Sequence, residues 1–557
     1  MKVRRSVLVM ALLLALAALV VGVAACGGSS SSSSSSAASS TTPVKGGTLT
    51  VTFQGEPTGL DPAIAWEVES NCIEKLTYET LLSYVNAPGD AGTKLAGELA
   101  TEVPSAANGG ITQGGRVYTF HIKQGVKFAP PVSRDVTAQD FKYSIERMLK
   151  SPLAPATYFY TGITGAQDFI AGKAKEVKGI KVIDPYTLQV TLDKPDVSFL
   201  YSFTLTFTSA IPKEWVAKWG KRVDRHPLGS GPYIIQSWTA GQEIVAVKNP
   251  NWTAPTQQWV NEIHFEFASN PGTALLRLER GEVDLLGDSI PPADYLRTKV
   301  DPTWGKYVVA APQINSYYVY LNVTEKPFDN QKVRQAINYA VDTQKIQKLL
   351  AGQAIAANQV YPKGMPGYQP DKQYYTYDPA KAKQLLAEAG FPNGFKTTFY
   401  THNVDPFPKI AQSIQNDLAA VGIQANIKQY DRATYWNMVG VKSSHFGIGL
   451  TDWIMDYPDP SDWIGPLYTH PSDGSADIAF YNNPQVNALY EASKSELDPV
   501  KRIDMYKQME DIIMNDAPLV PLYQSVWTSM YGKTTGGFFI QPVWIFIFQN
   551  YWKTNGQ

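Results

Sequence analysis

Two observations predict an α/β fold divided into at least two lobes. Strand-like segments alternate with helix-like segments of about 10–15 residues along most of the chain, an order typical of α/β lobes. Of the 557 residues, roughly 500 follow an unusual N-terminal segment, and that is more than one hydrophobic core usually holds. We therefore expect sheets covered by helices in two or more lobes.

Residues 316–350 show this alternation most clearly. The aromatic and β-branched run from Tyr317 to Leu321 predicts a strand. Asp329 or Asn330 then offers a side-chain oxygen that can cap a helix, and Asp342 can cap the helix after it. The buried stripe of the first helix, at i, i+3, i+4, i+7 and i+8, is formed by Val333, Ala336, Ile337, Ala340 and Val341.

Shorter patterns predict the other elements. Tyr78 to Leu82 is expected to close a helix, and Thr137 to cap another. In the turn-like segment Gly-Ser-Gly-Pro-Tyr, Gly229 and Gly231 permit positive φ angles. Further strands are expected at 46–51, 118–122, 184–192 and 424–429, further helices at 137–149, 380–389 and 500–514, and an extended segment at 517–523.

The N-terminus predicts export from the cytoplasm. Basic residues at positions 2, 4 and 5 precede an uncharged run to Ala25, so residues 1–25 are expected to be a signal peptide. Small residues directly before Cys26 resemble a bacterial lipobox, which predicts that Cys26 is lipidated. Residues 26–45, with their Ser29–Ser36 run, then form a flexible tether. The alternative is an uncleaved transmembrane anchor, and both place the body outside the cytoplasm.

Composition excludes several classes of protein. The chain has 50 acidic and 49 basic residues, which argues against nucleic-acid binding and against a polybasic membrane patch. Cys72 is the one cysteine besides Cys26, so neither an internal disulfide nor a four-cysteine metal site is expected. The six histidines form no close pair, and no cofactor is implied. Aromatic residues, at 12%, suit a wet binding cleft as well as a large core.

The amino-acid sequence of residues 316–350 resembles that of one family, the extracytoplasmic solute-binding proteins of family 5. These proteins serve bacterial ATP-driven (ABC) importers of dipeptides, oligopeptides and nickel. The resemblance continues through Val136–Phe141 and Leu228–Tyr233 and covers about residues 46–530. Its central signature consists of Asn322, Pro327-Phe328-Asp329, Val333-Arg334-Gln335-Ala336 and Tyr339-Ala340-Val341-Asp342.

The resemblance implies a large (cluster C) periplasmic-binding-protein-like fold with two lobes and an extra subdomain in lobe I. Lobe I is then expected at 46–312, with its insertion at about 91–209, and is completed by 520–557. Lobe II is expected at 313–519. The segments that cross between the lobes are expected near Ala311–Asn315 and Asp516–Leu522. Ligand would bind between the lobes and close them about this hinge.

The candidate binding site lies in residues 452–463, which combine acidic and aromatic residues with prolines. Trp453 and Asp456 match the family's Trp-x-x-Asp element, and the resemblance implies that Asp456 pairs with the α-ammonium of a peptide. The competing interpretation is that these acids cap helices and form turns, and that the aromatic residues fill the core. Further candidate ligand contacts are Tyr457, Asp459, Trp66, Glu67, Trp436 and Tyr523.

The expected function follows from this resemblance. The protein is expected to be a monomeric, lipid-anchored substrate-binding protein on the outer face of the cytoplasmic membrane, which delivers peptides to an ABC permease. It is not expected to be an enzyme, and no catalytic or metal-binding residues are assigned. Alternatives are an oligosaccharide or nickel-chelate ligand, and a sensor lipoprotein. Paired aspartates in an aromatic cleft also suit a glycoside hydrolase.

Overall fold

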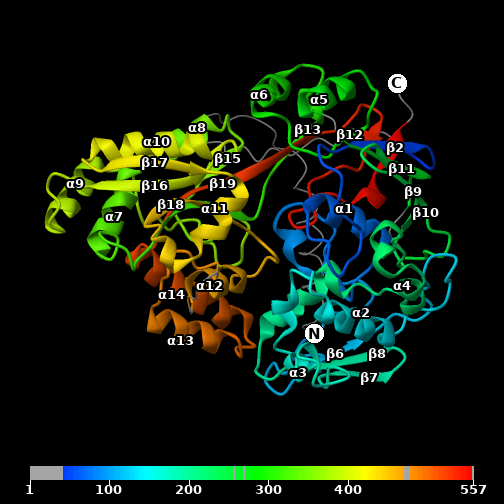
Figure 1. Cartoon of the computed structure of the whole chain (residues 1–557). Coiled ribbons are helices and arrows are strands. Elements are labelled where there is room, and N and C mark those ends of the chain that lie inside the picture. The colour runs from blue at the N-terminus through cyan, green and yellow to red at the C-terminus, as the bar shows by residue number, and fades with distance from the viewer. Residues whose placement is uncertain (1–41, 255–257, 268–269, 470, 472–475, 555–557) are drawn as a thin grey trace, which may run out of the picture. The chain divides into compact units, whose positions relative to one another are not determined.

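Two main sheets with their covering helices organise the chain in the computed structural model (Figure 1). The structure describes residues 42–254, 258–267, 270–469, 471 and 476–554. The predicted signal peptide, Cys26 and nearly all of the tether lie outside these residues. Within the described part of the chain, no helix is both long enough and apolar enough to cross a membrane.

The first main sheet defines the first lobe. Its strands follow the order β12-β2-β11-β10-β9, with β2 parallel to both β11 and β12 and with β10 antiparallel to its neighbours. Leu49 and Val51 of β2 pack with Ile73 of helix α1 in a buried core. The strands are β2 Thr48–Thr52, β9 Tyr233–Thr239, β10 Glu243–Lys248, β11 Glu262–Glu266 and β12 Leu285–Leu286. The helices nearby in sequence are α1 Val68–Thr77, α4 Lys213–Trp219, α5 Pro271–Glu279 and α6 Pro292–Val300.

A separate sheet lies within the predicted insertion, with the strand order β5-β6-β8-β7. The strand expected at 184–192 corresponds to β8, which pairs with a strand, β7, that the sequence patterns did not predict. β7 ends at Asp184, whose carboxylate accepts a hydrogen bond from the Tyr186 backbone in the turn, and β8 begins at Thr187. The elements are β5 Ile111–Thr112, β6 Val117–His121, β7 Ile180–Asp184, β8 Thr187–Thr191, α2 Ala138–Lys150 and α3 Ala166–Ile170.

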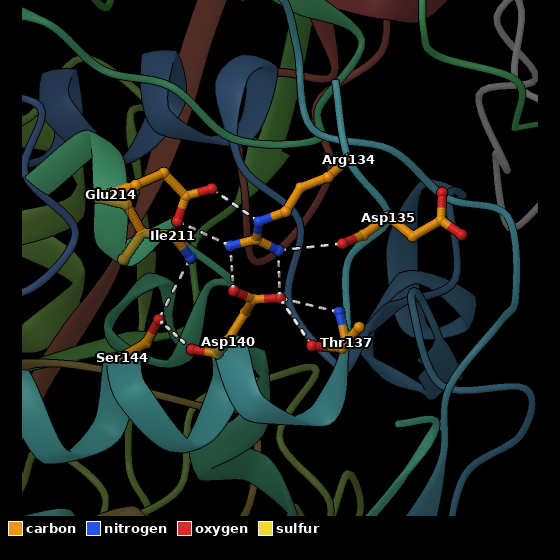
Figure 2. A network of polar contacts seen from close by, with 7 residues as sticks. All are labelled: Arg134, Asp135, Thr137, Asp140, Ser144, Ile211 and Glu214. Atoms are coloured by element: carbon orange, nitrogen blue, oxygen red, sulfur yellow. Dashed lines mark hydrogen bonds and ion pairs between the residues drawn. The ribbon is translucent and has the colours of Figure 1, made fainter. Parts of the chain in front are cut away.

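A polar network fixes the start of α2 (Figure 2). As expected, Thr137 is the N-cap, and its backbone N–H donates to Asp140 at 2.9 Å. Arg134 makes two hydrogen bonds to Asp140, at 2.7 and 3.0 Å, and its guanidinium also reaches Glu214 of α4 at 2.6 Å. The Ser144 hydroxyl accepts from the backbone of Ile211. The network therefore ties α2 of the insertion to the segment around α4.

The second main sheet defines the second lobe. Its order is β13-β19-β14-β18-β16-β17, with β15 paired to β19. Its strands are β13 Val308–Pro312, β14 Asn315–Leu321, β15 Ala354–Ala356, β16 Lys396–His402, β17 Gln424–Tyr430, β18 Ile448–Ile454 and β19 Leu519–Met530. Its helices are α7 Gln331–Ala340, α8 Thr343–Leu349, α9 Pro379–Glu388, α10 Phe407–Ala420, α11 Arg432–Val439, α12 Ser461–Tyr468, α13 Pro484–Ser493 and α14 Pro499–Asp516.

The predictions for the central stretch are confirmed. Strand β14 contains the expected run, and the expected stripe of α7 is buried. The cap of α7 is Asn330, which accepts from the Lys332 backbone at 2.9 Å. Asp342 caps α8 by accepting from the Gln344 backbone at 3.0 Å. Pattern and capping chemistry together therefore located this strand-helix-helix unit.

Strand β19 runs from the second lobe into the first. Its first half pairs with β14, and its second half, from Val526, pairs with β13. Ser529 then donates to the Leu286 carbonyl of β12 at 2.7 Å. The lobes also touch directly, because the Val197 backbone of the insertion donates to the Lys494 carbonyl at 2.9 Å. The remaining strands are β1 Pro43–Val44, β3 Leu82–Tyr84, β4 Leu95–Gly97, β20 Thr535–Gly536 and β21 Trp552–Thr554.

Two local predictions need correction. Helix α1 ends at Thr77, and Leu82 begins strand β3 instead of lying in the helix, because it pairs with Gly97 of β4. Gly229 and Gly231 do not have positive φ. They pack so closely against α1 that a Cβ on either would lie 2.5 Å or less from a backbone oxygen. Close approach, and not turn conformation, requires glycine here.

Candidate functional site

Four of the predicted residues lie where β18 leads into α12. Trp453 is in β18 and pairs with Ser316 of β14, while Asp456, Tyr457 and Asp459 follow in the connecting loop. Trp453 and Asp456 are half-buried, and Tyr457 and Asp459 are buried. These side chains thus lie at and just beyond the C-terminal end of β18, an interior strand of the second lobe's sheet.

Asp459 forms an ion pair with Arg502 of α14. Its two carboxylate oxygens each accept a hydrogen bond from Arg502, both at 2.7 Å, and Asp459 is only 2% exposed. Burial alone would raise the pKa of Asp459, but the charge and hydrogen bonds of Arg502 hold it below its usual value. Asp459 also accepts from the Ser461 backbone at 3.0 Å. Its observed contacts therefore stabilise the loop.

Asp462 positions Asp456 and Trp453. This buried carboxylate accepts from the Asp456 backbone at 2.9 Å and from the Trp453 indole at 3.4 Å. Burial, followed by the nearby charge of Asp456, raises the pKa of Asp462 well above its usual value. Asp462 therefore fixes the backbone of Asp456 and the indole of Trp453, while the carboxylate of Asp456 is not used in this contact.

The Asp456 carboxylate meets the first lobe's insertion. The hydroxyl of Tyr158, in the short segment Thr157–Tyr160, donates to Asp456 at 3.2 Å across 298 residues of sequence. Burial raises the pKa of Asp456 to about 6, and hydrogen bonds with Tyr158 and Asp462 oppose the increase. The group is therefore mostly an anion at neutral pH, in surroundings that favour a positively charged partner.

Aromatic rings from both lobes surround this contact. Tyr457 stacks on Tyr201 with ring centres 5.3 Å apart and lies edge-on to Phe159 at 6.0 Å. Phe159 lies 6.5 Å from Trp66, which stacks on Phe207 at 4.8 Å. Trp66 is 36% exposed, so part of its indole stays open to contact. The rings connect Trp66 of the first lobe to the loop of Asp456.

Glu67, next to Trp66, has local partners. Its carboxylate accepts from the Thr58 hydroxyl at 2.5 Å and from the Ser70 hydroxyl at 2.9 Å. Burial acts to raise the pKa of Glu67, but these hydrogen bonds leave it below its usual value. The observed contacts of Glu67 thus hold the start of α1, where it is the N-cap residue.

Tyr523 and Trp436 belong to a second aromatic group. Tyr523 of β19 stacks on Tyr317 of β14 with ring centres 4.4 Å apart and an angle of 5°. Both rings line a cavity of about 650 Å³ between the sheet edge and the starts of α5 and α6. Trp436 of α11 lies 6.4 Å from His402, whose ring packs on Phe407 beside Tyr317. No contact in the described residues joins Tyr523 or Trp436 directly to Asp456.

The structure therefore adds residues that sequence reasoning missed. Tyr158, Phe159 and Tyr201 come from the insertion, far from Asp456 in the sequence, and no local motif marks them. The one available signal is that Tyr158 and Phe159 follow each other in an aromatic segment after a helix. Within the described residues, no group of three or more His, Cys, Asp or Glu side chains is arranged to hold a metal ion.

Comparison with known proteins agrees with this architecture. Residues 94–475 match the family model described as "Bacterial extracellular solute-binding proteins, family 5 Middle". The chain is similar to heme-binding protein A of Haemophilus influenzae, with 31% identity over 510 residues that cover 87% of this chain and 88% of that protein. It is also similar to the glutathione-binding protein GsiB of Salmonella typhi, with 30% identity over 87% of this chain and 90% of that protein.

A solved structure shows the same fold. The periplasmic binding protein DppA from Helicobacter pylori, in complex with the peptide STSA, superposes with a TM-score of 0.72. It is 25% identical, and the match covers 92% of this chain and 99% of that one. The two-lobed binding-protein fold expected from the sequence is therefore the fold of this chain.

Proposed function

Because this chain belongs to the family 5 extracellular solute-binding proteins, which serve ABC importers, we propose that it captures peptides between its lobes and delivers them to a membrane permease. The α-ammonium of the peptide binds the carboxylate of Asp456. The aromatic rings of Trp453, Tyr457 and Trp66 contact the residues that follow. A similar structure that holds a peptide supports this choice of ligand.

One observation carries the proposal: Asp456 is the acid of its loop that faces the other lobe. Asp459 is paired with Arg502, and Asp462 is buried beneath the loop, whereas Asp456 meets the hydroxyl of Tyr158. An ammonium-carboxylate hydrogen bond in such surroundings is short and charge-assisted, so a single residue can select ligands with a free amino terminus. The raised pKa of Asp456 reflects the low polarity that strengthens this bond.

The same arrangement favours binding over hydrolysis. A glycosidase needs two carboxyl groups that flank the scissile bond. In this loop the Asp459 carboxylate is bound to Arg502, and the Asp462 carboxylate accepts from the Asp456 backbone. Of the acids at 456, 459 and 462, this leaves Asp456 to act on a ligand. We propose that the protein is a binding component and not an enzyme.

Calorimetry of four combinations tests the proposal. A tripeptide and its N-acetylated form are titrated into the parent protein and into Asp456→Asn, which keeps the shape of the side chain and removes its charge. Leaving one member of a buried charge pair without its partner costs about 2–5 kcal/mol, or roughly 30- to several-thousand-fold in affinity. Acetylation should therefore weaken binding strongly in the parent and only slightly in the variant.

Two results would contradict the proposal. If acetylation weakens binding equally in both proteins, Asp456 does not recognise the amine. If neither peptide binds the parent, the ligand is not a peptide. Mass spectrometry of the solute that copurifies with the native protein would then identify the ligand class.

A further inference from the structure

A second carboxylate, Asp452, lies in β18, four residues before Asp456. Asp452 of β18 is paired directly with Tyr317 of β14, and Tyr317 is paired with Tyr523 of β19. Directly opposed residues of antiparallel strands share one face of a sheet. Asp452 therefore lies on the same face as Tyr317 and Tyr523, the stacked rings that line the cavity of about 650 Å³.

The Asp452 carboxylate has no polar partner. Among the described residues it forms neither a hydrogen bond nor an ion pair, although the residue is half-buried. Burial raises the pKa of Asp452 to about 6, and only the charge of Arg432 opposes this increase. Arg432 is exposed and lies beyond ion-pair distance from Asp452. A half-buried carboxylate without a partner is costly unless something else supplies positive charge.

The surroundings of Asp452 suit a cation. The half-buried ring of Tyr317, which stacks on the buried Tyr523, lies on this face of the sheet, and aromatic faces attract ammonium and guanidinium groups. His402 supplies no positive charge, because burial and then the charge of Arg432 lower its pKa to about 4. Among the described residues, Arg432 is thus the cation whose charge acts on the pKa of Asp452.

We propose that Asp452 is a second cation subsite of the same cleft, so that the preferred ligand is a short peptide with a lysine or arginine side chain. This inference rests on the proposed function, in which the α-ammonium binds Asp456. Asp452 and Asp456 are four residues apart, which is at most about 13 Å along an extended strand. A tripeptide spans about 10 Å, so a basic side chain at its second or third residue reaches this far.

Matched tripeptides test the inference. Peptides with a free amino terminus carry either lysine or its uncharged counterpart norleucine at the second or third residue, and their affinities are measured by calorimetry. The parent protein should bind the better lysine peptide about tenfold or more tightly than the norleucine peptide, as expected for one charge-assisted contact. Asp452→Asn should abolish this preference, while acetylation should still weaken binding of the norleucine peptide.

Arg432→Gln is the matched control, because it removes a nearby cation whose charge acts on Asp452 and competes with the ligand. It should increase the preference for lysine. Equal binding of lysine and norleucine peptides by the parent, or tighter binding of norleucine, overturns the inference even if Asp452→Asn does not fold. If acetylation still weakens binding in that case, the proposed function stands and only the second subsite is lost. If no free-amino peptide binds the parent, both fail.

Discussion

The proposed role of Asp456 predicts that peptide binding depends on pH. Its pKa is raised to about 6 by burial, and only the ionised carboxylate can pair with an ammonium group. Affinity should therefore be highest near pH 7, where the peptide's α-amino group (pKa about 7.7–8.0) is still mostly protonated, and should fall by about tenfold per unit as pH drops below 6, because protonation of Asp456 then competes with binding. Calorimetry across this range measures the effect, and Asp456→Asn should give a nearly flat profile. A profile of the same shape in both proteins would assign the titration to another group.

For single residues, the sequence allowed predictions only where a local motif was present. The spacing of Trp453 and Asp456 marked the loop, and both residues lie at the end of β18 beside the other lobe. It could not predict Tyr158, which approaches Asp456 only because the insertion folds against the second lobe. The sequence analysis also explained the glycine at 229 by a positive φ, whereas the actual cause is close packing on α1, which depends on tertiary structure.

The loop between β18 and α12 is held by helix α14. Arg502 of α14 holds Asp459 with two hydrogen bonds in a buried setting. Arg502→Met leaves the Asp459 carboxylate buried without its partner, so the free energy of unfolding at neutral pH should fall by about 3–5 kcal/mol. Lys501→Met is the control, because Lys501 is exposed on the same helix, and its effect should stay within about 0.5 kcal/mol. Urea denaturation measures both.

The pH dependence of this loss has a definite sign. The pKa of Asp459 is lower in the folded state than in the unfolded state, so its pairing stabilises the fold above the unfolded pKa of about 4. This contribution is lost as pH falls through the folded pKa. The difference between the parent and Arg502→Met should therefore shrink in acid. A small loss at neutral pH would show that the loop does not need this pair.

At the scale of elements, periodicity and capping predicted α7, α8, α9 and α14 well, because long amphipathic patterns and Asn or Asp caps are local signals. Short elements were harder to predict. The strand predicted at 184–192 corresponds to β8, and β7 was not predicted, since the turn between them contains a proline and a tyrosine instead of a glycine pair. Which strands pair depends on contacts distant in sequence, so the order of neither main sheet followed from the patterns.

For the whole molecule, we propose that lipidation of Cys26 anchors the protein to the membrane. Small residues before Cys26 and a serine-rich segment after it support a lipid anchor. Metabolic labelling with a palmitate analogue should mark the parent protein, and Cys26→Ser should lose both the label and retention in the membrane fraction. Cys72→Ser is the control and should keep both. Unchanged labelling of Cys26→Ser would contradict lipidation at this residue.

The lobes of the whole molecule meet at the candidate site. The contacts of Tyr158 with Asp456 and of Val197 with Lys494 join the insertion to the second lobe, and β19 runs between the two main sheets. Closure about such a connection can enclose a ligand between the lobes and shield its charged end from water. Chain length predicted two or more lobes and the family resemblance predicted two, whereas their contacts required the structure.

A crystal structure of the protein with a bound free-amino tripeptide tests this account most directly. We predict that the peptide lies between the lobes, with its amino nitrogen about 3 Å from the Asp456 carboxylate. Its first residues should contact Trp453 and Tyr457. A peptide bound outside the cleft, or one whose carboxyl end lies nearest to Asp456, would contradict the account.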